Sequence, residues 1–456
     1  MVYNSATMNR REFITAGAGA FFIASSSRLF GAEAPSSRLR FAIVGCRKGG
    51  RGETVLGNAL KVPGVDIACV CDVDSRAMDY AAELVRAKTG VLPRKEKDFR
   101  KVLEMNDVDG IISVTPDHFH AYSAVMAMRA GKHVYVEKPC AYCPHECEVI
   151  RETWQATGMC FQMGSQRRSR PGYLQAMKEI REGNLIGETH YAKCWYNTKR
   201  GPIGRGKVVP VPEWLDWDLW QATAPREDFR DNLVPYNWHW FRKWGTGECG
   251  NNSIHFVDVA RWCLGAEWPE RVVSSGGRYF QPADQDWEWP DTQTVNMEFP
   301  GGKLITWEGT SCANANPYMG IGTGCMVYGE KGVLYFMDGT EVRLYDNDGK
   351  FVREWGTMPK ADAKDVIDYN NRAGGGSTDS TQFHFANLVD CIRANAPEKA
   401  AANADIGTKS TMIALLGNIS QTTGEAIRVD PATGRMLNRG AAENLWSREY
   451  AKGWEV

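Results

Sequence analysis

The chain has 456 residues, of which 43% are hydrophobic and 24% are charged. This length is too great for one ordinary domain and suits two, and the composition is typical of a globular protein. The formal net charge of −1 excludes the strongly basic surface by which proteins bind nucleic acids or acidic membranes. We therefore expect two domains and no nucleic-acid partner.

The first 34 residues have the pattern of an export signal. Arg10 and Arg11 precede an apolar run rich in Gly and Ala at 16–24, and small residues follow at 32–34. Paired arginines before a weakly apolar run are typical of a twin-arginine signal, and the run is too short to span a bilayer. We expect residues 1–34 to be a twin-arginine signal peptide, a periplasmic or otherwise exported protein, and no membrane span.

Residues 38–164 alternate between two kinds of periodicity. Short apolar and β-branched runs predict strands at 38–44, 65–71, 110–114, 133–136 and 159–163. Helical spacing separates them, at 75–89, 98–105, 118–130 and 144–157. Strands that alternate with helices indicate βαβ units and a parallel, doubly wound sheet. The fold class that we expect is α/β, with an N-terminal Rossmann domain at 38–164.

Residues 165–456 have a different pattern. A long stretch rich in Gly, Pro and Trp covers 198–250, and a clear amphipathic helix follows at 252–264. Pairs of alternating runs around short turns then predict β-hairpins, at 292–310, 325–336 and 342–355, before helices return at 382–394 and 406–423. We expect a C-terminal α/β domain with an open, mostly antiparallel sheet.

A Gly-rich turn follows the first predicted strand. It contains Gly45, Gly49 and Gly50 and leads into a predicted helix. Backbone N–H groups and the dipole of a helix N-terminus together bind a pyrophosphate. The spacing departs from G-x-G-x-x-G because either Arg47 or an insertion stands where the second glycine belongs. Gly52 also lies in this turn, so close backbone approach remains available.

Asp72 ends the second predicted strand. A carboxylate at this position accepts hydrogen bonds from the adenosine ribose and repels a 2′-phosphate, which favours NAD over NADP. Arg76 lies nearby and is a counter-signal, so NADP stays open as the alternative cofactor.

Two further loops follow the third and fourth predicted strands, and such loops line the ligand crevice of a doubly wound sheet. We expect Thr115, Pro116, His118 and His120 to pack against the nicotinamide. In Glu137-Lys138-Pro139, Lys138 can hydrogen-bond a developing alkoxide, and Glu137 can hold Lys138 or the ribose.

This ordered set of motifs resembles the glucose–fructose oxidoreductase / inositol dehydrogenase / MocA family, in its exported branch. The resemblance continues through later motifs, namely Gln166-Arg167-Arg168, the run 215–220, Gly245-Thr246-Gly247 and His255-Phe256-Val257-Asp258. It implies a Rossmann domain followed by an α/β domain whose open sheet serves substrate binding and oligomer contacts. It also implies that Lys138 and His255 are catalytic residues. The family's third catalytic residue, an Asp four positions before the His, is Asn251 here.

Asn251 cannot act as a base, but it can orient a hydroxyl group by donating and accepting hydrogen bonds. The proton transfer therefore rests on His255. Asp258 lies one helical turn after His255 and can orient its imidazole or simply cap a surface. The sequence leaves both roles open.

Five further residues are candidates for substrate binding, namely Arg167, Arg168, Tyr236, Trp238 and His239. Aromatic faces with polar groups suit a carbohydrate, and arginine suits a carboxylate or phosphate; the same residues can equally form an interface. The run 140–147 contains three cysteines and a histidine, but no second Cys/His pair accompanies it, so we expect no metal site.

The expected function is oxidoreduction of CH–OH groups of a sugar or sugar derivative by hydride transfer with NAD(P). Because export separates the protein from the cytoplasmic cofactor pool, we expect a cofactor that is tightly bound and recycled. The alternatives are a redox-neutral NAD-dependent glycosidase, lyase or epimerase, and a non-catalytic carbohydrate-binding protein. We expect a homo-oligomer, either a dimer or a tetramer.

Overall fold

The computed structural model describes residues 38–339, 341–356 and 380–456. All elements below belong to one unit of the chain, residues 39–456. The predicted signal peptide at 1–34 lies outside the described residues. Within them, each helix is too short or too polar to cross a membrane.

A six-stranded parallel sheet forms the N-terminal half, in the order β3-β2-β1-β4-β5-β6. Its strands are β1 (Leu39–Val44), β2 (Val65–Cys71), β3 (Arg94–Glu96), β4 (Gly110–Ser113), β5 (His133–Val136) and β6 (Phe161–Met163). This is the strand order of the Rossmann fold, and it confirms the predicted fold class. Only β3 was not predicted, because it is a short, charged and largely exposed edge strand.

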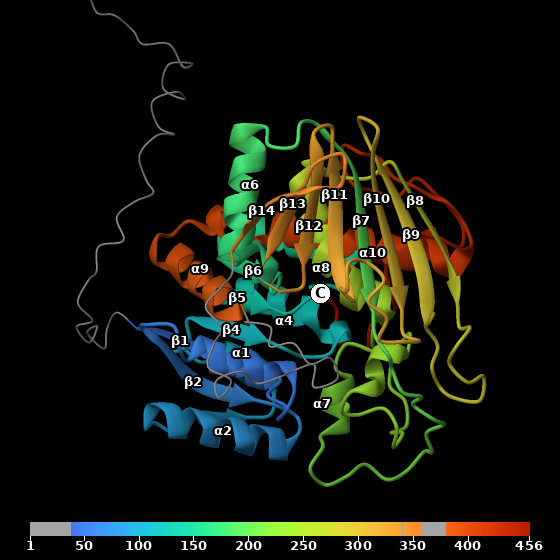
Figure 1. The fold of residues 1–456 in the computed structure, drawn as a ribbon. Helices are drawn as coiled ribbons and strands as arrows, with labels where there is room; N and C mark the ends of the chain where they lie inside the picture. The colour runs from blue at the N-terminus through green and yellow to red at the C-terminus, as the bar shows by residue number, and fades with distance from the viewer. Residues whose placement is uncertain (1–37, 340, 357–379) are drawn as a thin grey trace, which may run out of the picture. The chain divides into compact units, whose positions relative to one another are not determined.

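Helices cover both faces of this sheet (Figure 1). They are α1 (Arg51–Ala59), α2 (Ser75–Thr89), α3 (Phe99–Leu103), α4 (Asp117–Arg129) and α5 (Pro144–Thr157). A further helix, α9 (Thr381–Arg393), comes from far along the chain and packs against α1. Its Phe385 lies 5.1 Å from the Phe41 ring and 5.8 Å from the Tyr135 ring. The C-terminal part of the chain therefore completes the core of the N-terminal sheet.

The second sheet has nine strands in the order β14-β13-β12-β11-β7-β10-β9-β8-β15. Only the β7–β10 pair is parallel, so the predicted mostly antiparallel sheet is confirmed. The strands are β7 (Thr189–Asn197), β8 (Arg271–Gly277), β9 (Thr292–Phe299), β10 (Lys303–Thr310), β11 (Thr323–Gly329), β12 (Gly332–Met337), β13 (Val342–Tyr345), β14 (Phe351–Trp355) and β15 (Ile427–Arg428).

Alternation along the strands directs apolar side chains to one face of this sheet. In β9 and β10 the buried positions are Val295, Met297, Ile305 and Trp307. The helices α8 (Ile254–Leu264) and α10 (Ala404–Thr423) pack on the sheet, and α10 also contacts α5. A separate helix, α6 (Pro171–Gly183), contacts the far strands β13 and β14. α10 thus bridges the two halves.

The stretch 198–244, which we call the cap, has its own apolar cluster. The cluster contains four Trp and two Phe side chains among its buried members, which include Trp217, Trp220, Phe229, Trp238, Phe241 and Trp244. The cap includes α7 (Trp217–Gln221) and the 3-10 helix η3 (Asn237–Trp240). Backbone contacts join it to the carboxyl ends of the parallel strands, at Asp74–Leu215 and at His118–Trp244. The Trp-rich stretch therefore covers the edge of the sheet where ligands bind in this fold.

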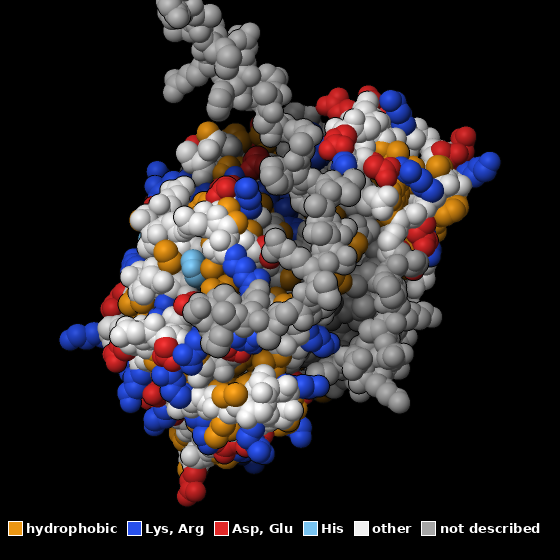
Figure 2. Space-filling model, turned by 90° about the vertical axis from the view of Figure 1, so that its left-hand side faces the viewer, with side chains coloured by type: hydrophobic (Ala, Val, Ile, Leu, Met, Phe, Trp, Pro, Cys, Tyr) orange, Lys and Arg blue, Asp and Glu red, His pale blue; other side chains and the backbone are white. Residues whose placement is uncertain are grey.

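Charges of both signs are intermixed over the face that Figure 2 draws, in keeping with the net charge of −1. The thirteen cysteines are free thiols, and all except the half-buried Cys312 are buried.

One buried ion pair connects the segment after β6 with α8. Arg168, in the 3-10 helix η2 (Gln166–Ser169), donates to both carboxylate oxygens of Asp258 at 2.7 and 2.9 Å. Ser410 of α10 donates to the same carboxylate at 2.6 Å. The two charged side chains are only 8% and 1% exposed. Three segments distant in sequence therefore meet at one carboxylate.

Removing one partner of a buried ion pair leaves the other charge without compensation. We expect Arg168→Met to lower the apparent free energy of unfolding by about 3–5 kcal/mol, measured by urea denaturation. The matched control is Arg271→Met, which removes the exposed pair between Arg271 and Glu298 and should change stability by less than about 1 kcal/mol. Equal effects of the two substitutions would contradict this role of Arg168.

Candidate active site

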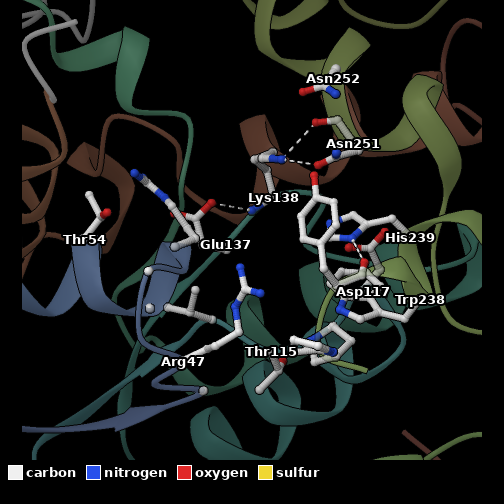
Figure 3. A pocket seen from close by; sticks show the side chains of 18 of the residues that line it. Arg47, Thr54, Thr115, Asp117, Glu137, Lys138, Trp238, His239, Asn251 and Asn252 are labelled. Atoms are coloured by element: carbon white, nitrogen blue, oxygen red, sulfur yellow. Dashed lines mark hydrogen bonds and ion pairs between the residues drawn. The ribbon is translucent and has the colours of Figure 1, made fainter. Parts of the chain in front are cut away.

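A cavity of about 1490 Å³ lies where the parallel strands end. Its lining comes from the loops after the parallel strands, from the cap, and from one end of the second sheet, and Figure 3 shows part of it. Pockets for single small molecules measure roughly 300–1,000 Å³. This cavity is therefore large enough for a dinucleotide together with a small substrate.

The glycines of the turn after β1 are required by close backbone packing. A Cβ atom on Gly45 would lie 2.3 Å from the carbonyl oxygen of Val114, and Gly45 has a φ of +88°. A Cβ atom on Gly52 would lie 2.3 Å from the carbonyl oxygen of Gly45. Any larger residue at Gly52 would push the N-terminus of α1 away from the turn. This is the cradle that a pyrophosphate needs.

Gly49 lines the cavity, but Gly50 does not. A Cβ atom on Gly50 would lie 2.7 Å from Nε of Arg47, so Gly50 makes room for the Arg47 side chain. Arg47 extends into the cavity (Figure 3), and its guanidinium lies 5.7 Å from the centre of the Tyr236 ring. The residue that breaks the glycine motif thus places a cation beside the cradle.

Asp72 is half-buried after the end of β2 and lines the cavity. It accepts hydrogen bonds from the backbone N–H groups of Cys46 (2.6 Å) and Asp74 (2.9 Å). Burial raises the pKa of its carboxyl group to about 6, although these hydrogen bonds act in the opposite direction. A carboxylate here suits the ribose hydroxyls of a dinucleotide. Arg76 pairs with Asp74 and stacks on Trp214 instead of lining the cavity.

Lys138 follows β5, is half-buried and lines the cavity. Its Nζ donates to the carbonyl oxygen of Asn251 at 2.9 Å and to its side-chain oxygen at 2.5 Å (Figure 3). Burial lowers the pKa of the ammonium group, while Glu137 and Asp117 act to raise it. An ammonium group has three donors, so one N–H remains for a ligand.

Asn251 belongs to a π-helical turn, η4 (Cys249–Ser253), that leads directly into α8. His255 lies in the first turn of α8 and lines the same cavity. No hydrogen bond from the described part of the chain holds its imidazole. Burial, and next the charges of Arg167 and Lys138, lower the pKa of His255 well below 6.5. The imidazole is therefore neutral at neutral pH and can accept a proton.

Asp258 does not orient His255, contrary to one of the two expected roles. Its carboxylate is occupied by Arg168 and Ser410. Because Arg168 pairs with Asp258, it does not line the cavity. The sequence suggested both positions from their spacing in the motifs, but spacing along the chain does not reveal that Arg168 and Asp258 bind each other.

The predicted crevice residues Thr115, Pro116, His120 and Glu137 all line the cavity. Nδ1 of His120 lies 2.7 Å from the carbonyl oxygen of Pro139, and Glu137 pairs with Arg51 at 2.9 Å. His118 does not reach the cavity. Its Nε2 bonds to the Trp220 carbonyl of the cap at 3.1 Å, and burial lowers its pKa to about 3. His118 therefore joins the cap to the sheet.

The predicted substrate residues Arg167, Tyr236, Trp238 and His239 all line the cavity. His239 stacks on Trp238 at 3.6 Å and bonds to the Tyr236 carbonyl through Nδ1 at 2.6 Å. Burial lowers the pKa of His239 to about 3. The cap thus presents a wall of aromatic rings.

The sequence reasoning missed several lining residues. Arg200 donates to Glu248 at 2.9 Å and to the hydroxyl groups of Tyr236 (3.0 Å) and Tyr196 (3.1 Å). Trp454, near the end of the chain, also lines the cavity. No local signal marks either residue, because only the folded chain brings them to the site. In residues 38–339, 341–356 and 380–456, no group of three or more His, Cys, Asp or Glu side chains could hold a metal ion.

Comparison of the whole chain with known proteins identifies two family models. The model of the oxidoreductase family with an NAD-binding Rossmann fold (GFO/IDH/MocA) matches residues 39–165, and the model of the GFO/IDH/MocA C-terminal domain matches residues 174–335. The glycine cradle, Asp72 and the strand order fit the NAD site of the first model.

Curated relatives include scyllo-inositol 2-dehydrogenase (NAD(+)) of Bacillus subtilis (strain 168), which is 29% identical over 243 residues, 53% of this chain and 58% of the relative. A glycosyl hydrolase family 109 protein of Stenotrophomonas maltophilia (strain K279a) is 30% identical over 197 residues, 41% of this chain and 42% of the relative. The chain spans about half the length of these relatives.

Among solved structures, a levoglucosan dehydrogenase in complex with NADH and levoglucosan superposes with a TM-score of 0.64 at 17% identity, covering 86% of this chain and 99% of that one. This likeness supports the fold. Two consecutive domain models match more than half of the chain, in the order in which the structure shows the two sheets, so the protein belongs to the GFO/IDH/MocA oxidoreductase family.

Proposed function

We propose that this protein is an NAD-dependent oxidoreductase that acts on a CH–OH group of a sugar or sugar derivative. The observation that carries the proposal is the position of Lys138. Its ammonium group is held by Asn251, and Lys138 lines the same cavity as the glycine cradle, the aromatic wall and His255. Bound NAD would accept or donate the hydride at this point.

In this proposal Lys138 donates its third N–H to the substrate oxygen and stabilises the developing alkoxide. Asn251 is a positioning residue, since its two oxygens fix the direction of the ammonium group. An amide cannot take the proton that a carboxylate would take at this position. The neutral imidazole of His255 is therefore the group that accepts the hydroxyl proton.

The substrate class follows from the walls of the cavity. Tyr236, Trp238 and His239 supply aromatic surface, while Arg167 and Arg200 supply donors. A ring that carries several hydroxyl groups suits this combination of faces and polar groups.

Assembly into a homo-oligomer through the open sheet stays a prediction.

We further propose that the cofactor stays bound through the catalytic cycle. The cap covers the carboxyl edge of the sheet and is bonded to it through its middle, at Leu215, and through its C-terminal end, at Trp244. A cofactor that stays bound must return to its starting oxidation state within each cycle. It can pass its hydride to a second carbonyl substrate, or it can return the hydride to the same sugar. The likeness to glycosyl hydrolase family 109 proteins favours the second route, a redox-neutral glycosidase, as the alternative function.

We expect nicotinamide dinucleotide to co-purify with the protein and a sugar to change its absorbance at 340 nm. Lys138→Met should lower kcat by about 10²–10⁴-fold and change NADH affinity only a few-fold, since the cradle is intact. The control Lys243→Met removes an exposed ion pair of the cap and should leave kcat unchanged.

Release of an aryl aglycone without net change in the bound cofactor would select the redox-neutral alternative. A protein that binds NADH while no sugar in a broad screen reduces or oxidises the cofactor would contradict both catalytic functions. That outcome would favour a carbohydrate-binding protein.

The pH profile should reflect the two lowered pKa values. His255 must be neutral, and its pKa lies well below 6.5, so kcat/KM should stay level as the pH falls from 8 to 6. Lys138 must be protonated, and its pKa lies below 10.5, so activity should fall on the alkaline side before that pH. A loss of activity centred at pH 6.5 would contradict the role of His255.

We propose export by the twin-arginine route on the basis of the sequence at 8–34. Replacing both Arg10 and Arg11 with Lys should retain the protein in the cytoplasm of a bacterial host, as judged by fractionation. Arg28→Lys is the matched control and should not change export. Unchanged periplasmic recovery of the double variant would contradict the proposal.

A further inference from the structure

The last part of the chain, residues 429–456, is called the tail below. It lies beyond both family models, which end at residues 165 and 335. The tail contains the 3-10 helix η6 (Glu443–Leu445) and ends beside α4, where the C mark stands in Figure 1. Its contacts place it at the dinucleotide cavity and not on a remote surface.

Trp454 of the tail is 6% exposed and is one of the residues that line the cavity. Its ring packs against Tyr122 (5.1 Å) and Phe119 (6.1 Å) of α4, and the Arg100 guanidinium lies 4.8 Å from its centre. The indole therefore fills the gap between α3 and α4 and presents part of its surface to the cavity.

The contacts of Trp454 identify the end of the cavity that it lines. Phe119 packs edge-on against Phe99 at 5.5 Å, and Phe99 opens α3, directly after the edge strand β3. This side of the sheet is the side of β2 and Asp72, whereas Lys138 follows β5. Because Asp72 is placed to bind the adenosine ribose, the adenine would lie toward Phe99, Phe119 and Trp454.

Arg448 fastens the tail to two other parts of the molecule. Its side chain is 9% exposed and pairs with the fully buried Glu146 of α5 at 2.6 Å. It also donates to the carbonyl oxygen of His118 at 2.6 Å and to the Thr223 hydroxyl of the cap at 3.0 Å. The rings of Tyr142 and Tyr450 flank its guanidinium, each at 4.8 Å. One side chain thus joins the tail, the cap and the parallel-sheet half.

We propose that the tail is part of the dinucleotide site, with Trp454 as a residue that contacts the adenine and Arg448 as the residue that positions the tail. The proposal rests on the proposed function only in requiring that NAD is bound. Its consequence is that the tail controls the rate at which the dinucleotide leaves. An aromatic contact with a base and a fastened tail both have to be broken before release.

The test uses the full chain loaded with NADH, whose fluorescence falls when an excess of NAD⁺ displaces it. We expect Trp454→Ala to raise the dissociation rate roughly 10- to 100-fold and Trp454→Phe to have a smaller effect. The matched control is Trp446→Phe, in the same tail. The indole Nε1 of Trp446 donates to Glu148 at 3.0 Å, and Trp446 does not line the cavity. This control should keep the wild-type rate.

A second measurement distinguishes loss of the contact between Trp454 and the adenine from a general loosening of the tail. Trp454→Ala should weaken binding of ADP-ribose, which carries the adenine, and leave the affinity for nicotinamide mononucleotide unchanged. Arg448→Lys, which keeps the charge opposite Glu146, should release NADH more slowly than Arg448→Met.

An unchanged NADH dissociation rate in Trp454→Ala would overturn the proposal, as would equal losses of affinity for ADP-ribose and nicotinamide mononucleotide. If the wild-type protein bound neither NADH nor ADP-ribose, the proposed function would fail instead, so the two failures are distinguishable.

Discussion

The ammonium group of Lys138, at the carboxyl edge of the parallel sheet, is held by hydrogen-bond acceptors from the other half of the chain. Both acceptors that hold it come from Asn251, in the π-helical turn before α8, more than a hundred residues away. An unpaired buried charge is costly, so this contact fixes the distance between the parallel sheet and the second sheet at the site. The carboxylate of Asp117, which accepts from the backbone N–H and the hydroxyl group of Thr246, adds a second buried link nearby. The position of His255, one turn further along α8, follows from the same constraint.

The cap and the tail both cover the ligand site at the carboxyl edge of the parallel sheet. The carboxyl edge of a parallel sheet offers loops and helix N-termini that bind ligands, and a cofactor held there needs cover from solvent. The cap supplies this cover with an aromatic cluster of its own and with backbone bonds to the loops after β2 and β4. The tail contributes Trp454 at one end of the cavity and Arg448 at the junction with the cap. Cover and catalytic groups therefore come from segments far apart in the sequence.

The predictions from sequence were accurate where the signal is local. The alternation of strands and helices, the turn at Gly45, the carboxylate at Asp72 and the lysine after the fourth predicted strand all lie where the pattern put them. The errors concern direction and partnership. His118 and Arg168 lie beside residues that line the cavity, yet each turns toward a buried partner, the Trp220 carbonyl and Asp258 respectively. The sequence identified Arg47 as a departure from the glycine motif, but it did not predict that the Arg47 side chain extends into the cavity.

Local pattern is sufficient to predict the Rossmann half, since hydrophobic periodicity and glycine spacing depend on neighbours within one βα unit. It also pointed to Lys138 and His255, through motifs that resemble a known family. Tertiary structure alone decided which residues share the cavity. α9 covers the N-terminal sheet, Arg200 meets Glu248 and the two tyrosines, and Trp454 lies beside α4. These contacts depend on burial and on the pairing of polar groups between distant segments, and no local pattern in the sequence encodes which distant segment will supply the partner.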